Sequence, residues 1–225
     1  MSFTSQIALR LLKEGNFRFL TGNPVHPAPE APSGPLYRMG QNPFAVVVTC
    51  ADSRLSPEII FDMDHGHLFV VKTAGNIASR FDIGSVEYAV RYLGVKLVVV
   101  MGHEACGAVD ASILKCIPDS SPLVKDPAAE YVVAIRKRIR RNLNLPEDKP
   151  CECDEAKPSC PDNPGRDMDL TEAINQNASA VRTNLTEKSA LLADAVKNHG
   201  VQILSAYYAF NGEVIFHEDL KAEES

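Results

Sequence analysis

The sequence predicts an α/β fold: a twisted, mainly parallel sheet with helices on both faces and one antiparallel edge strand. Short apolar runs rich in β-branched residues stand at 44–49, 68–71 and 97–101. Runs of this kind are typical of strands that are covered on both faces. Between the second and third runs, residues 84–93 carry apolar side chains at helical spacing. The order strand, helix, strand predicts a right-handed crossover and therefore parallel neighbours.

The antiparallel edge is predicted from the C-terminal part of the chain. An apolar run at 202–208 is followed by Asn211-Gly212 and then by a second run at 213–216, which is a hairpin signal. Helical patterns also predict helices at 105–115, 126–143 and 169–198.

The first 43 residues predict a helix and an extended arm. The helix should cover about 4–20, capped by Thr4 or Ser5. We expect its buried stripe to contain Ile7, Leu11, Phe17 and Leu20. Six prolines between 22 and 43 exclude regular structure there, so an arm should wrap its own domain or reach a second subunit. Residues 1–225 thus form one domain with an N-terminal helix and arm (1–43) and, at about 146–167, a surface insertion rich in Pro, Asp and Glu.

The composition excludes several classes of partner. The net charge is −6 and the charged residues are of mixed sign, so neither nucleic acid nor an anionic membrane surface is expected to bind. The apolar runs are far shorter than the roughly 20 residues that span a bilayer. The N-terminus lacks a secretion signal, which favours a cytoplasmic location. Six cysteines in such a chain favour thiols and metal ligation over disulfides.

Two motifs at predicted strand ends carry the chemistry. Cys50-x-Asp52-x-Arg54 follows the first run, and His103-x-x-Cys106 follows the third. The carboxyl ends of parallel strands share one edge of a sheet, where ligands bind. Two thiolates and an imidazole suit Zn²⁺ and leave its fourth position open to water, as in catalytic sites. We therefore predict one zinc per chain.

His103 and Cys106 are three residues apart at the start of an expected helix, so both side chains can face one point. The helix N-terminus would also stabilise the Cys106 thiolate. Taken alone, this motif is weak, and a capped histidine with a buried cysteine explains it better than a metal site does. The second motif, with Cys50, favours the metal site.

Asp52 and Arg54 are two residues apart, so in an extended chain they point to one side and can form a bidentate pair. An unrestrained carboxylate only two residues from a metal-binding cysteine could itself occupy the fourth position on zinc. A carboxylate held by a guanidinium group can instead accept the hydrogen bond of zinc-bound hydroxide. The alternative is a structural ion pair at a strand end.

Four stretches of the sequence resemble the β-class carbonic anhydrases. They are CADSR at 50–54, VKTAGN at 71–76, GSVEYAV at 84–90 and GHEACGAV at 102–109. The resemblance is close from about 41 to 109. It implies zinc-hydroxide-dependent, reversible hydration of CO₂ to bicarbonate by a homodimer or homotetramer. It also implies that the zinc ligands are Cys50, His103 and Cys106, and that the catalytic dyad is Asp52 and Arg54.

The same resemblance suggests two substrate-binding residues. Gln41 is similar in position to a family glutamine that reaches into the neighbouring subunit's pocket; the alternative is a turn residue before a strand. Gly107 resembles a glycine whose backbone N–H lies near bicarbonate; the alternative is close helix packing. The arm at 22–43 would then embrace the partner subunit.

The sequence also departs from the family pattern. Lys72 stands where many relatives have arginine, so an ion pair there would lose its fork geometry. Val47 and Thr49 occupy the strand end, where the Trp and Tyr markers of the bicarbonate-inhibited subgroup are not found. We therefore expect an open resting site with water as the fourth ligand.

Two other functions stay open at this stage. The same zinc site could hydrolyse carbonyl sulfide or carbon disulfide, which are linear and attacked at carbon like CO₂. Alternatively, Cys151, Cys153 and Cys160 could bind a second metal or form a disulfide in a non-enzymatic zinc or redox-sensing module. Asn175 and Asn177, in the expected C-terminal helix, are interpreted as packed or solvated amides.

Overall fold

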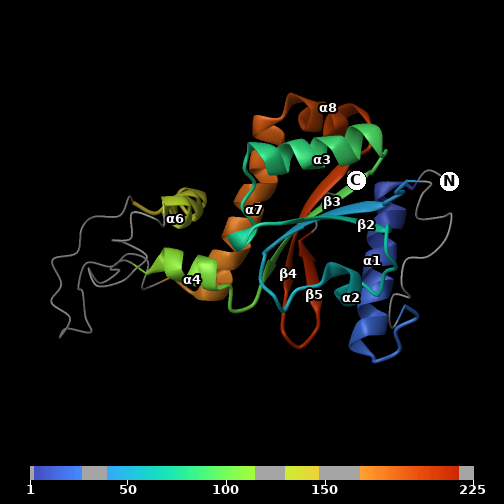
Figure 1. The fold of residues 1–225 in the computed structure, drawn as a ribbon, viewed down its shortest axis with the longest axis horizontal. Coiled ribbons are helices and arrows are strands. Elements are labelled where there is room, and N and C mark those ends of the chain that lie inside the picture. The colour runs from blue at the N-terminus through green and yellow to red at the C-terminus, as the bar shows by residue number, and fades with distance from the viewer. Residues whose placement is uncertain (1–2, 27–39, 115–129, 147–167, 218–225) are drawn as a thin grey trace, which may run out of the picture.

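The computed structural model describes residues 3–26, 40–114, 130–146 and 168–217. They form a five-stranded sheet with helices on both faces (Figure 1). Along the chain the strands are β1 (Ala45–Thr49), β2 (Leu68–Lys72), β3 (Leu97–His103), β4 (Gln202–Tyr208) and β5 (Val214–His217). Their order in the sheet is β2-β1-β3-β4-β5, and only the β4–β5 pair is antiparallel. The predicted mainly parallel sheet with an antiparallel edge is confirmed.

The central strands β1 and β3 are buried along their whole length. Thr49, the last residue of β1, pairs with Met101, and β3 continues for two more residues to His103. The chain therefore leaves both strands at the same edge of the sheet. This is the physical reason why the motifs after the two strands meet.

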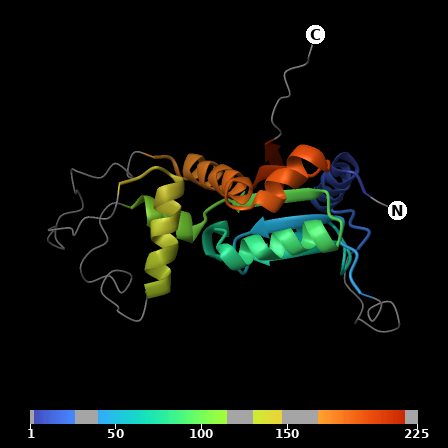
Figure 2. The ribbon, with the colours of Figure 1, turned by 90° about the horizontal axis from the view of Figure 1, so that it is seen from above.

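Seven α-helices and a 3₁₀ turn surround the sheet in the described part of the chain. They are α1 (Ser5–Leu20), α2 (Pro57–Ile60), η2 (Ala74–Asn76), α3 (Arg80–Tyr92), α4 (Gly107–Ile113), α6 (Glu130–Asn142), α7 (Leu170–Lys188) and α8 (Ala190–Asn198). Helices α1, α2, α4 and α6 belong to one core cluster, α3 and α8 to the other, and α7 contributes to both. Figures 1 and 2 show α4 and α6 together at the end of the molecule away from α1.

Helix α1 begins where the sequence predicts, with Thr4 accepting the Ile7 N–H, but the predicted buried stripe is wrong. Ile7, Phe17 and Leu20 are exposed. The face that packs inward instead contains Ala8, Leu9, Leu12, Gly15 and Asn16. A Cβ at Gly15 would lie 1.8 Å from the Phe61 carbonyl oxygen, so glycine lets the helix approach another segment's backbone. Close packing of backbones, rather than a stripe of large side chains, sets this face.

The predicted C-terminal helix is in fact two helices, because Ser189 interrupts it in an extended conformation. The Ser189 hydroxyl accepts the Leu192 N–H and donates to the Glu87 carboxylate of α3. Helix α3 begins at Arg80, earlier than expected. A capping box of Ser79 and Asp82 fixes that start.

Several predictions fall on residues that the structure does not describe. They concern most of the arm (27–39), the first residues of the helix expected at 126–143, and the insertion with Cys151, Cys153 and Cys160. The assignment of 1–225 to one domain likewise stays a prediction. Within the described residues, no helix is both long enough and apolar enough to cross a membrane.

Candidate metal centre

Cys50, His103 and Cys106 converge on one point inside the molecule. Their ligand atoms, two sulfurs and a ring nitrogen, all lie within 4.8 Å of one another, and all three residues are buried. The two sulfur atoms are 3.9 Å apart. The predicted convergence of the two strand ends is therefore confirmed.

The local structure that brings these side chains together differs in part from the prediction. Cys50 directly follows β1, and His103 is the last residue of β3. Cys106 is the N-cap of α4, so His103 and Cys106 do not share a helix as expected. Ala105, at φ 51°, turns the chain between them. The turn after β3, not helical spacing, directs both side chains to the same point.

The orientation of His103 favours a metal bond through one ring nitrogen. Its Nδ1 lies 2.8 Å from the Glu104 carbonyl oxygen. A carbonyl only accepts hydrogen bonds, so Nδ1 carries the proton and Nε2 keeps a free lone pair. Nε2 is buried and has no hydrogen-bond partner. A bond to a metal would satisfy this otherwise costly atom.

The two thiols influence each other's ionisation. The Cys106 side chain, as hydrogen-bond donor, lowers the pKa of Cys50, and the N–H of Gly75 also lowers it. The hydrogen bond to Cys50 and burial raise the pKa of Cys106, because a second negative charge beside the first is unfavourable. Both sulfurs can be anionic together when a cation lies between them. The donor set of two thiolates and one imidazole fits Zn²⁺.

Asp52 is held beside this cluster by Arg54. The guanidinium Nε and Nη2 donate to the two carboxylate oxygens at 2.9 and 2.7 Å, and the Arg54 backbone N–H donates to Oδ1 at 2.9 Å. Residues 53–54 form a turn, which the bond from the Leu55 N–H to the Asp52 carbonyl closes, so the expected extended geometry is wrong, although the bidentate pair forms. The bonds from Arg54 hold the pKa of Asp52 well below its usual range. Its Oδ2 lies 4.0 Å from His103 Nε2.

Phe210 is a wall of the site that the sequence did not indicate. The Arg54 guanidinium carbon lies 4.4 Å from the centre of its ring, and the ring centre is 6.0 Å from that of His103. Its backbone N–H donates to the Glu104 carboxylate at 2.7 Å. Phe210 follows β4, so only the pairing of β4 with β3 brings it here. No local pattern marks it.

Three further residues that the sequence singled out are Lys72, Gly107 and Gln41. Lys72 donates to the carbonyls of Leu55 and, at 3.4 Å, Asp52, so it supports the loop backbone and not a carboxylate. A Cβ at Gly107 would meet nothing within 4 Å, so close packing among the described residues does not explain this glycine. Gln41 is exposed shortly before β1.

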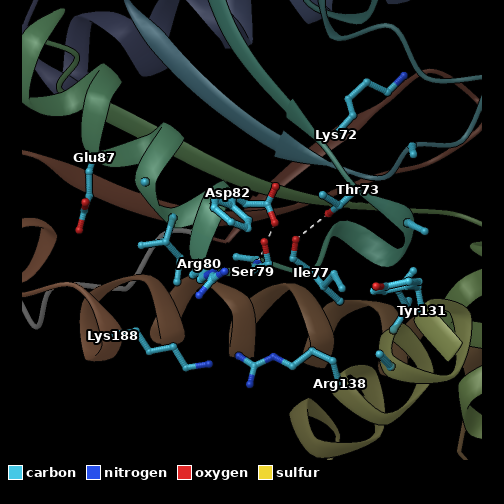
Figure 3. Close-up of a pocket in the computed structure, with 18 residues that line it drawn as sticks. Lys72, Thr73, Ile77, Ser79, Arg80, Asp82, Glu87, Tyr131, Arg138 and Lys188 are labelled. Atoms are coloured by element: carbon cyan, nitrogen blue, oxygen red, sulfur yellow. Dashed lines mark hydrogen bonds between the residues drawn. The ribbon is translucent and has the colours of Figure 1, made fainter.

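A cavity of about 1070 Å³ lies between α3, α6 and the end of β2, and Ala51 is the residue of its lining that is nearest in sequence to the cluster. Figure 3 shows Lys72 and Thr73 near one end of it and Arg138 and Lys188 on the opposite side from Ser79.

Comparison with known families identifies the chain's relatives. Residues 45–214, which include the whole cluster, match the family model described as carbonic anhydrase. The chain belongs to the carbonic anhydrase family. The predicted resemblance is thereby confirmed at the level of the family.

Individual carbonic anhydrases are similar over part of the chain. Carbonic anhydrase 2 of Mycobacterium tuberculosis is 49% identical over 106 residues, which are 47% of this chain and 51% of that protein. A carbonic anhydrase of Synechococcus elongatus is 37% identical over 115 residues, 48% of this chain and 42% of that protein. The chain thus spans about half the length of the curated relatives it matches.

Solved β-carbonic anhydrases share the fold. CafA of Aspergillus fumigatus superposes with a TM-score of 0.58 at 22% identity, covering 82% of this chain and 79% of that one. CcaA superposes with a TM-score of 0.57 at 21% identity, covering 81% and 83%. At these identities the likeness shows a β-carbonic anhydrase fold and no more.

Proposed function

We propose that this member of the carbonic anhydrase family catalyses the reversible hydration of CO₂ to bicarbonate at a zinc ion held by Cys50, His103 and Cys106. The observation that carries the proposal is the buried cluster of two thiols and one imidazole, with a restrained carboxylate beside it. The relatives from Mycobacterium tuberculosis, Mycolicibacterium smegmatis and Synechococcus elongatus are named carbonic anhydrases, which supports the same activity.

The chain's own groups would prepare the metal site. His103 would bind through Nε2, because its Nδ1 proton is engaged by the Glu104 carbonyl. The Gly75 N–H stabilises the Cys50 thiolate at 3.3 Å, and N–H groups at the start of α4 do the same for Cys106. Bound zinc would supply a water molecule activated near neutral pH. Two anionic thiolates neutralise the metal more than three imidazoles would, so activity should rise above neutral pH.

Asp52 would orient the reacting water. Its low pKa keeps it an acceptor, and Arg54 donates to both of its oxygens, which restrains it from becoming a fourth ligand. The Phe210 ring covers the guanidinium and limits its movement. The Asp52–Arg54 pair therefore holds a proton acceptor at a fixed place beside the metal.

Substrate binding would involve Gly107 and Gln41. Gly107 is the first residue of α4, where backbone N–H groups lack helical partners and attract anions such as bicarbonate. Gln41 would reach the pocket of a second subunit, and the proposed assembly is a homodimer or homotetramer. Two carbonic anhydrases of Sordaria macrospora with the same fold are described as tetrameric. Phe81 and Tyr131, large and exposed at the cavity, are suited to cover by another copy.

Two assays on one zinc-loaded sample test the substrate. CO₂ hydration is followed by stopped flow with a pH indicator, and sulfide release from carbonyl sulfide is followed separately. We expect hydration to be the faster reaction by a wide margin. Faster sulfide release would favour the hydrolase alternative at the same site.

Metal analysis of cysteine variants tests the ligands. Cys106→Ala should lose both zinc and hydration activity, whereas Cys151→Ala, a control outside the cluster, should keep both. A zinc-replete, active Cys106→Ala protein would contradict the ligand assignment. Two zinc ions per chain in the wild type, falling to one in Cys151→Ala, would support the alternative of a second metal site.

A further inference from the structure

A row of side-chain amides leads from the outer helices to the Cys50 sulfur. The Gly75 N–H, in η2, lies 3.3 Å from Cys50 Sγ. The Gly75 carbonyl accepts a hydrogen bond from Asn177 Nδ2 of α7 at 2.9 Å. Asn177 Oδ1 in turn accepts from Asn142 Nδ2 of α6 at 2.8 Å, and Asn184 Nδ2 lies 3.4 Å from Asn142 Oδ1.

The donor and acceptor groups fix the direction of the hydrogen bonds along this row of amides. The Gly75 carbonyl can only accept, so Asn177 must turn its NH₂ toward it. That leaves the Asn177 oxygen for the Asn142 NH₂. Asn177 is fully buried, yet both ends of its amide have partners. Such a satisfied buried amide is costly to replace, because its neighbours would lose their partners.

The backbone conformation of Gly75 is tightly constrained. Gly75 adopts the left-handed region at φ 66°, ψ 23°. A Cβ there would lie 2.6 Å from Ile139 Cδ1 and 3.3 Å from the Ala108 Cβ, so α6 and α4 press on it from outside. The bond from Asn177 to its carbonyl fixes the next peptide unit. Together these contacts hold the conformation in which the Gly75 N–H points at Cys50.

We infer that Asn177 is a positioning residue for the metal site: it acts through Gly75 to hold an N–H on the Cys50 thiolate. An N–H hydrogen bond withdraws electron density from sulfur, so the thiolate neutralises a bound metal less. Asn177 would thereby keep the metal more electrophilic and the ligand geometry fixed. The inference rests on the proposed zinc site and adds to it a residue from a distant helix.

Cobalt substitution tests the inference with a spectroscopic readout. In the Co²⁺-loaded protein, loss of the N–H···S bond should shift the thiolate-to-cobalt charge-transfer band to lower energy. Asn177→Ala should show this shift, and its zinc dissociation constant, measured by chelator competition, should rise about tenfold or more. Asn142→Ala, one step farther out, should shift the band in the same direction by less.

Asn16→Ala is the matched control. Asn16 is also a buried asparagine bonded to backbone groups, those of Ile60, Gly212 and Val214, but it lies on α1. This variant should lose comparable thermal stability while its band and zinc affinity stay as in the wild type.

The outcomes distinguish a positioning role of Asn177 at the metal site from a purely structural role. If Asn177→Ala loses stability like Asn16→Ala but keeps the wild-type band and zinc affinity, Asn177 is only structural and the inference is wrong. If Asn177→Ala does not fold, Asn142→Ala decides. A charge-transfer band at the wild-type energy in Asn142→Ala overturns the inference, and a band shifted to lower energy supports it. Failure of the proposed metal site looks different, because the wild type itself would then show no cobalt band that Cys50→Ala removes.

Discussion

Two aspartate–arginine pairs in this molecule are built from the same chemical groups and serve different ends. Asp52 and Arg54 are two residues apart at the metal cluster, and the Arg54 side chain is 53% exposed. Asp62 and Arg18 come from segments 44 residues apart, and the Asp62 side chain has no exposure. Local sequence thus forms the first pair, and folding forms the second.

The buried pair joins α1 to the loop after α2. Asp62 accepts hydrogen bonds from Arg18 Nε at 2.5 Å and from the backbone N–H groups of Val25 and His26. Burial raises the pKa of Asp62, but these donors outweigh burial, so the pKa is lowered overall. Both carboxylates accept three hydrogen bonds, but the donors to Asp62 come from α1 and the segment after it, so this buried carboxylate stabilises the fold. All three donors to Asp52 come from Arg54, and its Oδ2 stays beside the metal cluster, 4.0 Å from His103 Nε2.

The largest effect should come from Asp52→Asn. The amide keeps the shape but can no longer act as an anionic acceptor toward the reacting water. We expect hydration turnover to fall about 100-fold or more, with zinc content and thermal stability close to wild type. Stopped-flow assays with metal analysis check this. Full activity in the zinc-loaded variant would refute the role of Asp52.

Asp62→Asn should give the opposite pattern. Losing the charge opposite the partly buried Arg18 should lower the free energy of unfolding by about 1–3 kcal/mol. Urea denaturation measures this, and turnover per zinc below the melting temperature should be unchanged. A large loss of turnover in folded, zinc-loaded Asp62→Asn would contradict the assignment of a structural role to the buried pair.

Matched arginine-to-lysine changes test whether the two pairs have separate roles. Lysine cannot reproduce the bidentate fork, so Arg54→Lys should lower turnover about tenfold with little change in stability. Arg18→Lys should cost about 1 kcal/mol of unfolding free energy and leave turnover unchanged. If Arg54→Lys and Arg18→Lys changed turnover to the same extent, or the unfolding free energy to the same extent, the two pairs would not be functionally separate.

The smallest effect is the pH dependence of the buried pair. The pKa of Asp62 is lower in the folded than in the unfolded chain, so its stabilisation is complete above the unfolded value, about 3.9. It is lost as pH falls through the folded value. The difference in unfolding free energy between wild type and Asp62→Asn should therefore shrink below about pH 4. A difference that stays constant on acidification would contradict the assignment.

Sequence reasoning succeeded where chemistry lies close to a predicted strand end. Cys50, Asp52 and His103 could be placed because parallel strands end at one edge of a sheet. It failed where a polar or small residue meets a distant backbone. Ser189 breaks a helix by bonding Glu87, and Gly15 turns α1 toward Phe61.

The sequence alone determined the sheet, the metal-binding side chains and the carboxylate with its guanidinium partner, since strand patterns and short motifs are local properties. The tertiary structure alone decided that Phe210 covers Arg54 and that Asn177 reaches Gly75 across 102 residues. Periodicity tells which face of a helix or strand is apolar, and on α1 even that face is not the buried one. It does not tell which remote backbone carbonyl or ring will lie opposite a given residue, because that depends on how the packed helices and strands fit together.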